Sequence, residues 1–350
     1  MADYTTVDDP SVYFQTLLYS GNSSSPRDLV NDGNSDLQPD FVWLKGRTSY
    51  DHIHLVYDSN RGAGNFTRMD SVAAENAGNS YGVTAFNSDG FRTNSYVYSN
   101  ENGHNYVAWQ WKVNGGTTAS NTTGGINSTV QVNAAAGISI FTFTADGTTN
   151  TIGHGLGSKP DLVIFKSRNV GGGHLMITDL LDGSQDYLYL NLANAKADIG
   201  YAVHTSSVVE YNDNNTNTQV AYAFKNIQGY SKFGTYYGNG ISDGAFAYCG
   251  FKPAWVMIKN TGASEPWVIF DTKRNPYNIA NLKLVANSDD AENAHSATGG
   301  AGYNDIDIVS NGFKMRTNNG ATNQSGKRFL FMAFAESPFV SSEGVPTTAR

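Results

Sequence analysis

The feature that most constrains the fold is one strand pattern that occurs three times along the 350-residue chain. Each occurrence follows a proline and consists of large apolar residues that run into a lysine: FVWLKGR at 41–47, LVIFKSR at 162–168 and WVMIKNT at 255–261. The repeat period, roughly 90–120 residues, is far longer than that of a solenoid protein. Each copy is therefore expected to form a domain in its own right.

Each copy ends on a strand in which large apolar residues alternate with small or polar ones: YVAWQWK at 106–112, QVAYAFK at 219–225 and FLFMAFAE at 329–336. A period of two residues between turns rich in Asn and Gly is typical of antiparallel strands with one buried face. We therefore predict an all-β protein with three tandem antiparallel β-sandwich domains, of jelly-roll or lectin-like type, that arose by internal triplication.

The predicted domains cover residues 1–115, 116–228 and 229–340, and residues 341–350 are predicted to be a flexible tail. The segment 113–125 (VNGGTTASNTTGG) has the composition of a flexible hinge. The second junction is shorter and less polar. We therefore expect the second and third copies to pack closely while the first swings.

Charge and cysteine content exclude several classes of function. The net charge is −8 and no window combines clustered Lys and Arg with aromatic residues, so nucleic acid is not an expected partner. A single cysteine, Cys249, permits no internal disulfide. The acidic start MADYTTVDDPSVYF does not resemble a secretory signal, and no apolar run is long enough to insert into a membrane. We expect synthesis in a cytosol.

Catalytic motifs are weak. Residues 240–244 read GISDG, which matches the G-x-S-x-G nucleophile motif but falls in a hairpin turn with no helix after it. The recurring lysines and the aspartates that end the next strand are interpreted as structural. These residues are Lys45, Lys166, Lys259, Asp58, Asp179 and Asp271. We predict a protein that is not an enzyme, although a pair of carboxylates facing each other across a groove stays possible.

Candidate metal ligands are incomplete in the sequence. His52 and His54 lie two residues apart on a strand, but no third histidine or cysteine is near, so half-exposed strand histidines are expected. Asp32, Asn34 and Asp36 have the spacing of the first ligands in a calcium loop, but Trp43 occupies the place of its bidentate glutamate. No metal and no cofactor are predicted, and calcium binding is left open.

Tyrosines outside the core pattern are the candidate ligand-binding residues, because sugars bind through aromatic ring faces with polar groups nearby. Tyr96 and Tyr98 are expected to project from a hairpin at 95–102, and Tyr236 and Tyr237 to flank a Gly-rich turn. The copies differ most at hairpin tips, and recognition is expected there first. These tips are Ser95–Asn102, Glu210–Thr218 and Ala294–Asn304.

Several long phrases resemble uncharacterised tail or virion structural proteins of marine bacteriophages: NDGNSDLQPDFVWLKGR, IGHGLGSKPDLVIFKSR, GFKPAWVMIKNT and FMAFAESPF. The resemblance covers nearly the whole chain and implies a virion-associated, fibre-like protein, but it supplies no catalytic residues. It implies a location on the tail or particle surface after synthesis in the host cytoplasm, with other virion proteins as partners.

From the resemblance and the residues together, we expect a non-catalytic tail-fibre or tail-appendage protein that contacts the host surface and binds a glycan or receptor there. A homo-oligomer is expected, with a trimer as one symmetric form, because weak sites gain from multivalency. Two alternatives stay open: a capsid decoration or tail-joining protein without a ligand, and a polysaccharide depolymerase.

Overall fold

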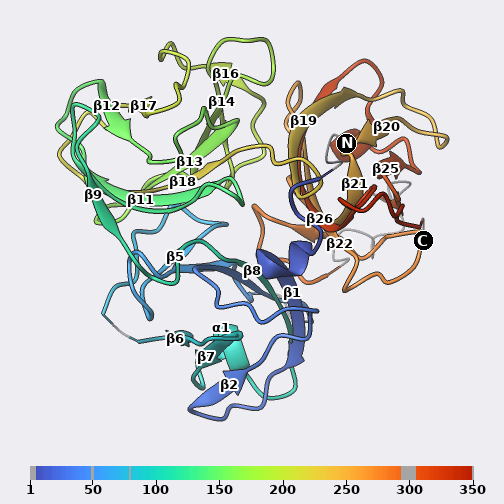
Figure 1. The fold of residues 1–350 in the computed structure, drawn as a ribbon, viewed down its shortest axis with the longest axis horizontal. Coiled ribbons are helices and arrows are strands. Elements are labelled where there is room, and N and C mark those ends of the chain that lie inside the picture. The colour runs from blue at the N-terminus through green and yellow to red at the C-terminus, as the bar shows by residue number, and fades with distance from the viewer. Residues whose placement is uncertain (1–4, 49–50, 79, 293–304, 349–350) are drawn as a thin grey trace.

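A computed structural model describes residues 5–48, 51–78, 80–292 and 305–348. Strands make up nearly all of the regular secondary structure of these residues, and the pairing within every sheet is antiparallel. The prediction of an all-β antiparallel fold is therefore confirmed. Figure 1 shows three lobes that meet at the centre, with both marked chain ends on the lobe that contains β19, β20 and β26.

Three large sheets form the body. The first has the order β1 (Phe14–Ser20), β8 (Asn105–Trp111), β3 (Phe41–Gly46), β4 (Leu55–Asp58), β5 (Phe66–Arg68). The second has the order β16 (Ala197–Asp198), β15 (Asp186–Tyr189), β14 (Leu175–Thr178), β13 (Leu162–Ser167), β18 (Thr218–Phe224), β11 (Ile138–Thr144), β10 (Ser128–Asn133), β9 (Ala119–Asn121). The third has the order β19 (Ser231–Tyr237), β26 (Arg328–Pro338), β21 (Phe251–Asn260), β22 (Val268–Asp271), β23 (Leu284–Val285).

A small sheet accompanies each large one. These are β2 (Arg27–Leu29), β7 (Phe91–Thr93) and β6 (Val83–Phe86); β12 (Asn150–Gly153) and β17 (Val208–Tyr211); and β20 (Phe246–Tyr248), β25 (Gly312–Met315) and β24 (Ile306–Val309). The described helices are short: a 3-10 turn at Pro10–Val12, α1 (Val97–Asn100) and α2 (Gly320–Asn323). Each large sheet and its small sheet enclose a separate apolar cluster, which gives each unit a sandwich-like arrangement.

Five strands follow the same order in each large sheet, and the central strands are buried on both faces. In β3, Val42 and Leu44 face the small sheet, whereas Phe41 and Trp43 enter a core shared by all three units. Because a side-chain period of two sends alternate residues to opposite faces, a strand with two covered faces is apolar throughout. The expectation that each closing strand has only one buried face is wrong, since Ala108 and Gln110 in β8 are fully buried as well.

The shared core is rich in aromatic rings from different units. Trp255 of the third unit lies with its ring centroid 6.3 Å from Trp43, 6.1 Å from Trp109 and 6.0 Å from Trp111. Phe41 of the first unit packs against Tyr222 of the second at 4.8 Å. Aromatic pairs at these separations add to the free energy gained from burial. The three units are therefore packed around one centre.

The segment predicted to be a hinge is held at both ends. The carboxylate of Asp40 accepts backbone hydrogen bonds from Val113, Gly115 and Gly116 at 2.6, 2.9 and 2.8 Å. Further on, β9 pairs with β10 of the second unit. These hydrogen bonds and the shared core hold the first unit against the others, which contradicts the expectation that the first copy swings. In the tail, Ser342 donates a backbone hydrogen bond to Asp8 at 2.7 Å.

Two local predictions also differ from the structure. Residues 97–100, expected within a hairpin, form helix α1. The tip Ala294–Asn304 lies outside the described residues. Within the described residues, no helix is long and apolar enough to cross a membrane.

Candidate functional site

The recurring lysines are fully buried, and each is surrounded by backbone carbonyls. Lys45 Nζ donates to the carbonyls of His52 and Asp289 at 2.5 and 3.0 Å. Lys166 Nζ donates to those of Gly172 and Val72 at 2.6 and 3.3 Å, and Lys259 Nζ to those of Glu265 and Ala193 at 2.6 and 2.7 Å. In each case one carbonyl belongs to the lysine's own unit and one to a neighbouring unit. The lysines therefore join the units in a closed ring.

These buried ammonium groups predict a pH-dependent stability. Burial lowers the pKa of Lys166 from 10.5 to about 8, so between these values the unfolded chain binds more protons than the folded one. The stability contributed by this group is therefore present above the unfolded pKa and lost as the pH falls through 8. Relative to Lys166→Met, the unfolding free energy of the wild type should rise by up to ~1.4 kcal/mol per pH unit in this window. Urea unfolding at about pH 7 and about pH 9.5 tests this, and a constant difference would contradict it.

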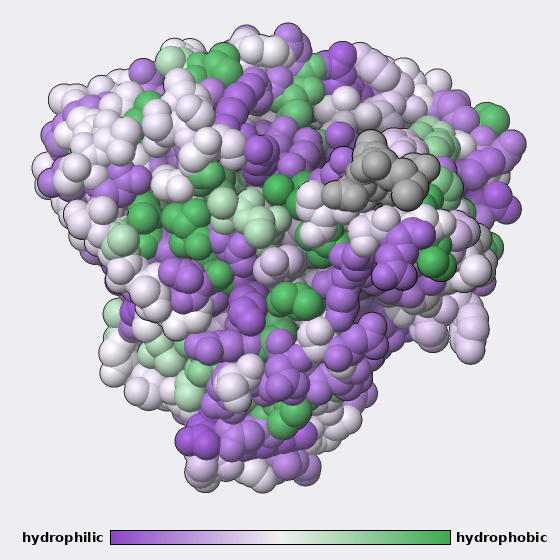
Figure 2. All heavy atoms as spheres, in the orientation of Figure 1, coloured by the Kyte–Doolittle hydropathy of each residue, from purple (hydrophilic) through white to green (hydrophobic). Residues whose placement is uncertain are grey.

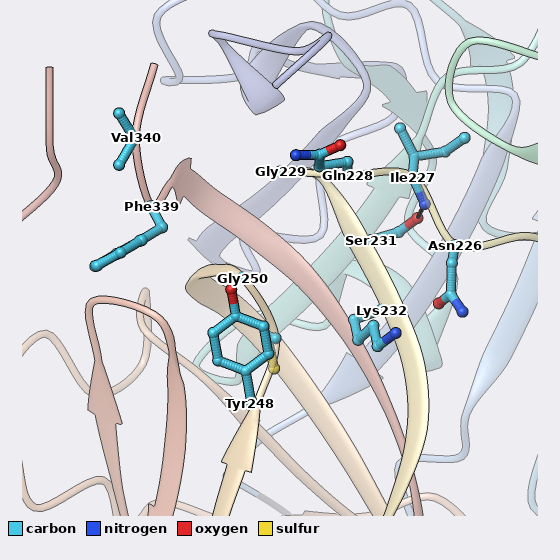
Figure 3. A pocket seen from close by; sticks show the side chains of 11 residues that line it. Asn226, Ile227, Gln228, Gly229, Ser231, Lys232, Tyr248, Gly250, Phe339 and Val340 are labelled. Carbon is cyan, nitrogen blue, oxygen red and sulfur yellow. Dashed lines mark hydrogen bonds between the residues drawn. The ribbon is translucent and has the colours of Figure 1, made fainter. Parts of the chain in front are cut away.

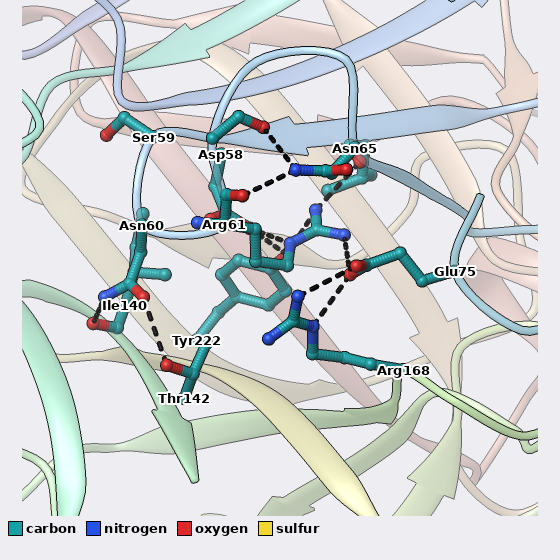
Figure 4. Close-up of polar contacts among 12 residues, drawn as sticks. Asp58, Ser59, Asn60, Arg61, Asn65, Glu75, Ile140, Thr142, Arg168 and Tyr222 are labelled. Carbon is teal, nitrogen blue, oxygen red and sulfur yellow. Dashed lines mark hydrogen bonds and ion pairs between the residues drawn. The ribbon is translucent and has the colours of Figure 1, made fainter. Parts of the chain in front are cut away.

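Two of the three junctions between units contain a buried ion network. At the first, Arg61 Nε lies 2.5 Å from Asp58, and Glu75 binds both Arg61 at 2.8 Å and Arg168 at 2.9 Å. Tyr222 of the second unit donates its hydroxyl hydrogen bond to Asp58 at 2.7 Å (Figure 4). Burial would raise the pKa of Glu75, but the two arginines hold it below its usual value.

The junction of the third unit with the first repeats these contacts. Arg274 lies 2.5 Å from Asp271 and 3.0 Å from Glu292, which also binds Arg47 at 2.9 Å. Trp109 donates to Asp271 at 3.0 Å, in the place that Tyr222 takes at the other junction. This network is structural, because its buried charges are paired with one another.

Within the residues that the structure describes, the junction of the second unit with the third lacks this network. By strand register, Thr178 takes the place of Asp58 and Asp271, so the prediction that Asp179 is equivalent to them is wrong by one residue. Met332 takes the place of Trp109 and cannot donate. Asp179 instead pairs with the exposed Lys159.

A hollow of ≈ 510 Å³ opens where the link between the second and third units meets the small sheet of the third. Figure 3 shows the rings of Tyr248 and Phe339 on one side and Lys232 and Asn226 on the other. Tyr248 is 59% exposed. No carboxylate in the described part of the chain pairs with Lys232, so its ammonium group is available in the hollow. Gly250 has φ 79° beside the Tyr248 ring, a conformation that a larger residue rarely adopts.

The sequence pattern does not single out Tyr248, because this residue lies in a strand whose inward positions are small. In β20 and the residue after it, Ala247 and Cys249 face the core, whereas Phe246 and Tyr248 point to solvent. Aromatic residues at alternate positions normally indicate the buried face. The sequence signal for the reversed orientation is the small size of Ala247 and Cys249. Small residues suffice at these buried positions, because Phe313 and Phe331 fill the core of the third unit.

The predicted tyrosines do not form one site. Tyr96 stacks on Tyr81 with centroids 4.8 Å apart, and Tyr98 meets Tyr96 edge-on, so these side chains form a half-buried cluster at α1. Tyr236 is buried in the third unit, and its hydroxyl donates to the Thr322 carbonyl at 2.5 Å. It therefore has no ring face for a ligand.

Tyr237 is 57% exposed, but the Arg328 guanidinium lies 5.0 Å from its ring centroid. One face of the Tyr237 ring is thereby covered. The hollow at Tyr248 consequently offers the better exposed ring.

Two groups of side chains have the composition of metal ligands. His52, Glu101 and His104 converge in the first unit, and Asp182, Asp186 and Asp198 in the second. Burial and the neighbouring His104 lower the pKa of His52, which keeps its imidazole neutral at neutral pH. His54, by contrast, is fully buried away from this group and contacts the carbonyl of Val285 at 3.0 Å.

The remaining motifs lie in turns. The GISDG segment leads into strand β20, and its Asp243 pairs with Lys314, so Ser242 does not stand at a strand-to-helix turn. Asp32 pairs with Lys273 at 2.8 Å.

Hydrophilic and hydrophobic residues are interspersed over the face shown in Figure 2, without a continuous apolar band.

A family model described as Domain of unknown function (DUF7483) matches residues 9–338. Neither the curated proteins nor the solved structures with which the chain was compared include a match. The match spans all three units and the residues that line the hollow, except Phe339 and Val340, and the chain therefore belongs to the DUF7483 family.

Proposed function

We propose that the protein is a non-catalytic surface component of a bacteriophage particle, of the tail-fibre or tail-appendage type, that binds host glycans in the hollow at Tyr248. The resemblance of its long phrases to phage tail and virion proteins supports the location. The exposed Tyr248 ring opposite Lys232 carries the proposal of glycan binding.

The chemistry of the hollow suits a sugar. The apolar face of a pyranose packs on an aromatic ring, and its hydroxyls need polar partners at the margin. Tyr248 and Phe339 supply the rings, and the Lys232 ammonium supplies hydrogen-bond donors opposite them. A carboxylate on the sugar would gain most from Lys232, because this lysine has no acidic partner among the described residues.

The repeated architecture supports a scaffold. We propose that three jelly-roll or lectin-like sandwich units arose by triplication, since five strands keep one order in each large sheet. Residues that recur, such as Lys45 and Lys166, hold the units together, whereas Tyr248 belongs to one unit only. A single weak site per chain would favour a homo-oligomer, with a trimer as one symmetric form.

Replacing Tyr248 by alanine should weaken binding to polysaccharide isolated from host cells by about tenfold or more, because the ring that packs on the sugar is removed. Tyr277→Ala is a matched control: this tyrosine is 79% exposed and lies outside the hollow. Biolayer interferometry with immobilised polysaccharide measures both. An equal loss of polysaccharide affinity in the two variants, or no loss in Tyr248→Ala, would reject the site. Release of reducing ends during incubation would indicate a depolymerase instead.

One observation favours a second function, that of a capsid decoration or tail-joining protein. Strand β20 is an edge strand whose Phe246 and Tyr248 are exposed, and such edges readily pair with other chains. A virion reconstruction with the β20 edge covered by a neighbouring protein would support this function. A free hollow facing outward would support glycan binding.

A further inference from the structure

The fold brings together three side chains that the sequence keeps apart. His52 precedes β4, Glu101 follows α1, and His104 lies just before β8. His52 Nε2 and His104 Nε2 lie 3.3 and 3.4 Å from the same Glu101 oxygen, Oε2. The ligand atoms of all three residues lie within 4.8 Å of one another.

These distances match a tetrahedral metal site. With metal–ligand bonds of about 2.0–2.1 Å, the ligand atoms of a tetrahedron are about 3.3–3.4 Å apart. Two imidazoles and one carboxylate are a donor set that zinc accepts, with a fourth position for water or another ligand. Nε2 of His52 also lies 3.2 Å from the Val97 carbonyl, a contact that metal binding would replace.

The charges also leave a place for a cation. Glu101 forms no ion pair with a lysine or arginine within the described ranges, and its partners are the two histidines. The group of Asp182, Asp186 and Asp198 is different, because Lys196 Nζ lies 2.6, 2.6 and 3.4 Å from the three carboxylates. Lys196 therefore already supplies the cation there, whereas no lysine or arginine of the described part of the chain does so at Glu101.

We propose that His52, Glu101 and His104 bind one divalent transition-metal ion of the zinc class. The ion ties the start of β4, the end of α1 and the start of β8 together. The Tyr98 ring packs edge-on against His52 with centroids 6.0 Å apart, so the ion also orders the tyrosine cluster at α1. This site is independent of the hollow at Tyr248.

The test is a zinc titration of the full-length chain by isothermal calorimetry, after removal of metal with a chelator. One ion should bind per chain, and Co²⁺ in its place should give the visible absorption of a tetrahedral site. His104→Ala and Glu101→Gln should each lower the affinity by about tenfold or more. Both side chains are partly exposed, at 29% and 40%, so these variants should fold.

Asp182→Asn is the matched control, because it removes one carboxylate from the group that Lys196 already neutralises. It should leave zinc affinity unchanged. Zinc should also raise the melting temperature of the wild type and of Asp182→Asn, but not that of His104→Ala. Absence of zinc binding in the wild type, or equal binding in the wild type and His104→Ala, would overturn the proposal.

Discussion

Replacement of Asp271 by alanine is expected to lower the free energy of unfolding by about 3–5 kcal/mol, because it removes the nearer of the two carboxylates that neutralise a buried arginine and leaves only Glu292. Arg274 is fully buried and lies 2.5 Å from the Asp271 carboxylate. Trp109 of the first unit would also lose the acceptor for its indole N–H. The substitution therefore removes an ion pair within the third unit and a hydrogen bond between the first and third units. Urea unfolding followed by tryptophan fluorescence measures it.

The chain contains its own control for this substitution. Asp179 ends the corresponding strand in the second unit, but its partner Lys159 is 44% exposed. An ion pair whose lysine is solvated contributes little, so Asp179→Ala should cost no more than about 1 kcal/mol. Similar costs for Asp271→Ala and Asp179→Ala would contradict the assignment of Asp271 to a buried network that joins units.

Replacement of Trp255 by alanine should also cost about 3–5 kcal/mol, because it opens a cavity in the core shared by the three units. Trp255 is 1% exposed and packs against three tryptophans of the first unit. Since all units contribute to this core, the whole chain should lose stability together. Differential scanning calorimetry should show one transition in the wild type and one in the variant, and the transition of the variant should lie at lower temperature.

Phe246→Ala is the control for this second substitution, because Phe246 is 46% exposed and its removal leaves no internal cavity. Its cost should stay below about 1 kcal/mol. A calorimetric profile in which Trp255→Ala shifts one of several separate transitions would show independent units, and would contradict a shared core.

The strands could be predicted because their signal is local. The segments at 41–47 and 162–168 coincide with β3 and β13, and the closing segment at 106–112 with β8. The repeat also indicates a structural role for the recurring lysines, and the carbonyls around Lys45 agree with this role. A repeat makes such positions recognisable, because the same local requirement returns in each copy.

The arrangement of the units could not be predicted, because it depends on which strands are covered on both faces and by which unit. The run FVWLKGR is apolar throughout, but only the structure shows that Trp43 faces one core and Val42 another. The same is true of the candidate metal ligands. His104 and Glu101 reach His52 across a fold in which about fifty residues separate them, a proximity that strand patterns do not encode.

The hollow at Tyr248 is tested most directly by a crystal structure of the protein with an oligosaccharide prepared from host surface polysaccharide. We predict density for a sugar ring stacked on Tyr248, with a hydroxyl or carboxylate of the sugar within hydrogen-bond distance of Lys232 Nζ. Density for the sugar only elsewhere, for example at Tyr96 and Tyr98, with Tyr248 left bare, would contradict the account.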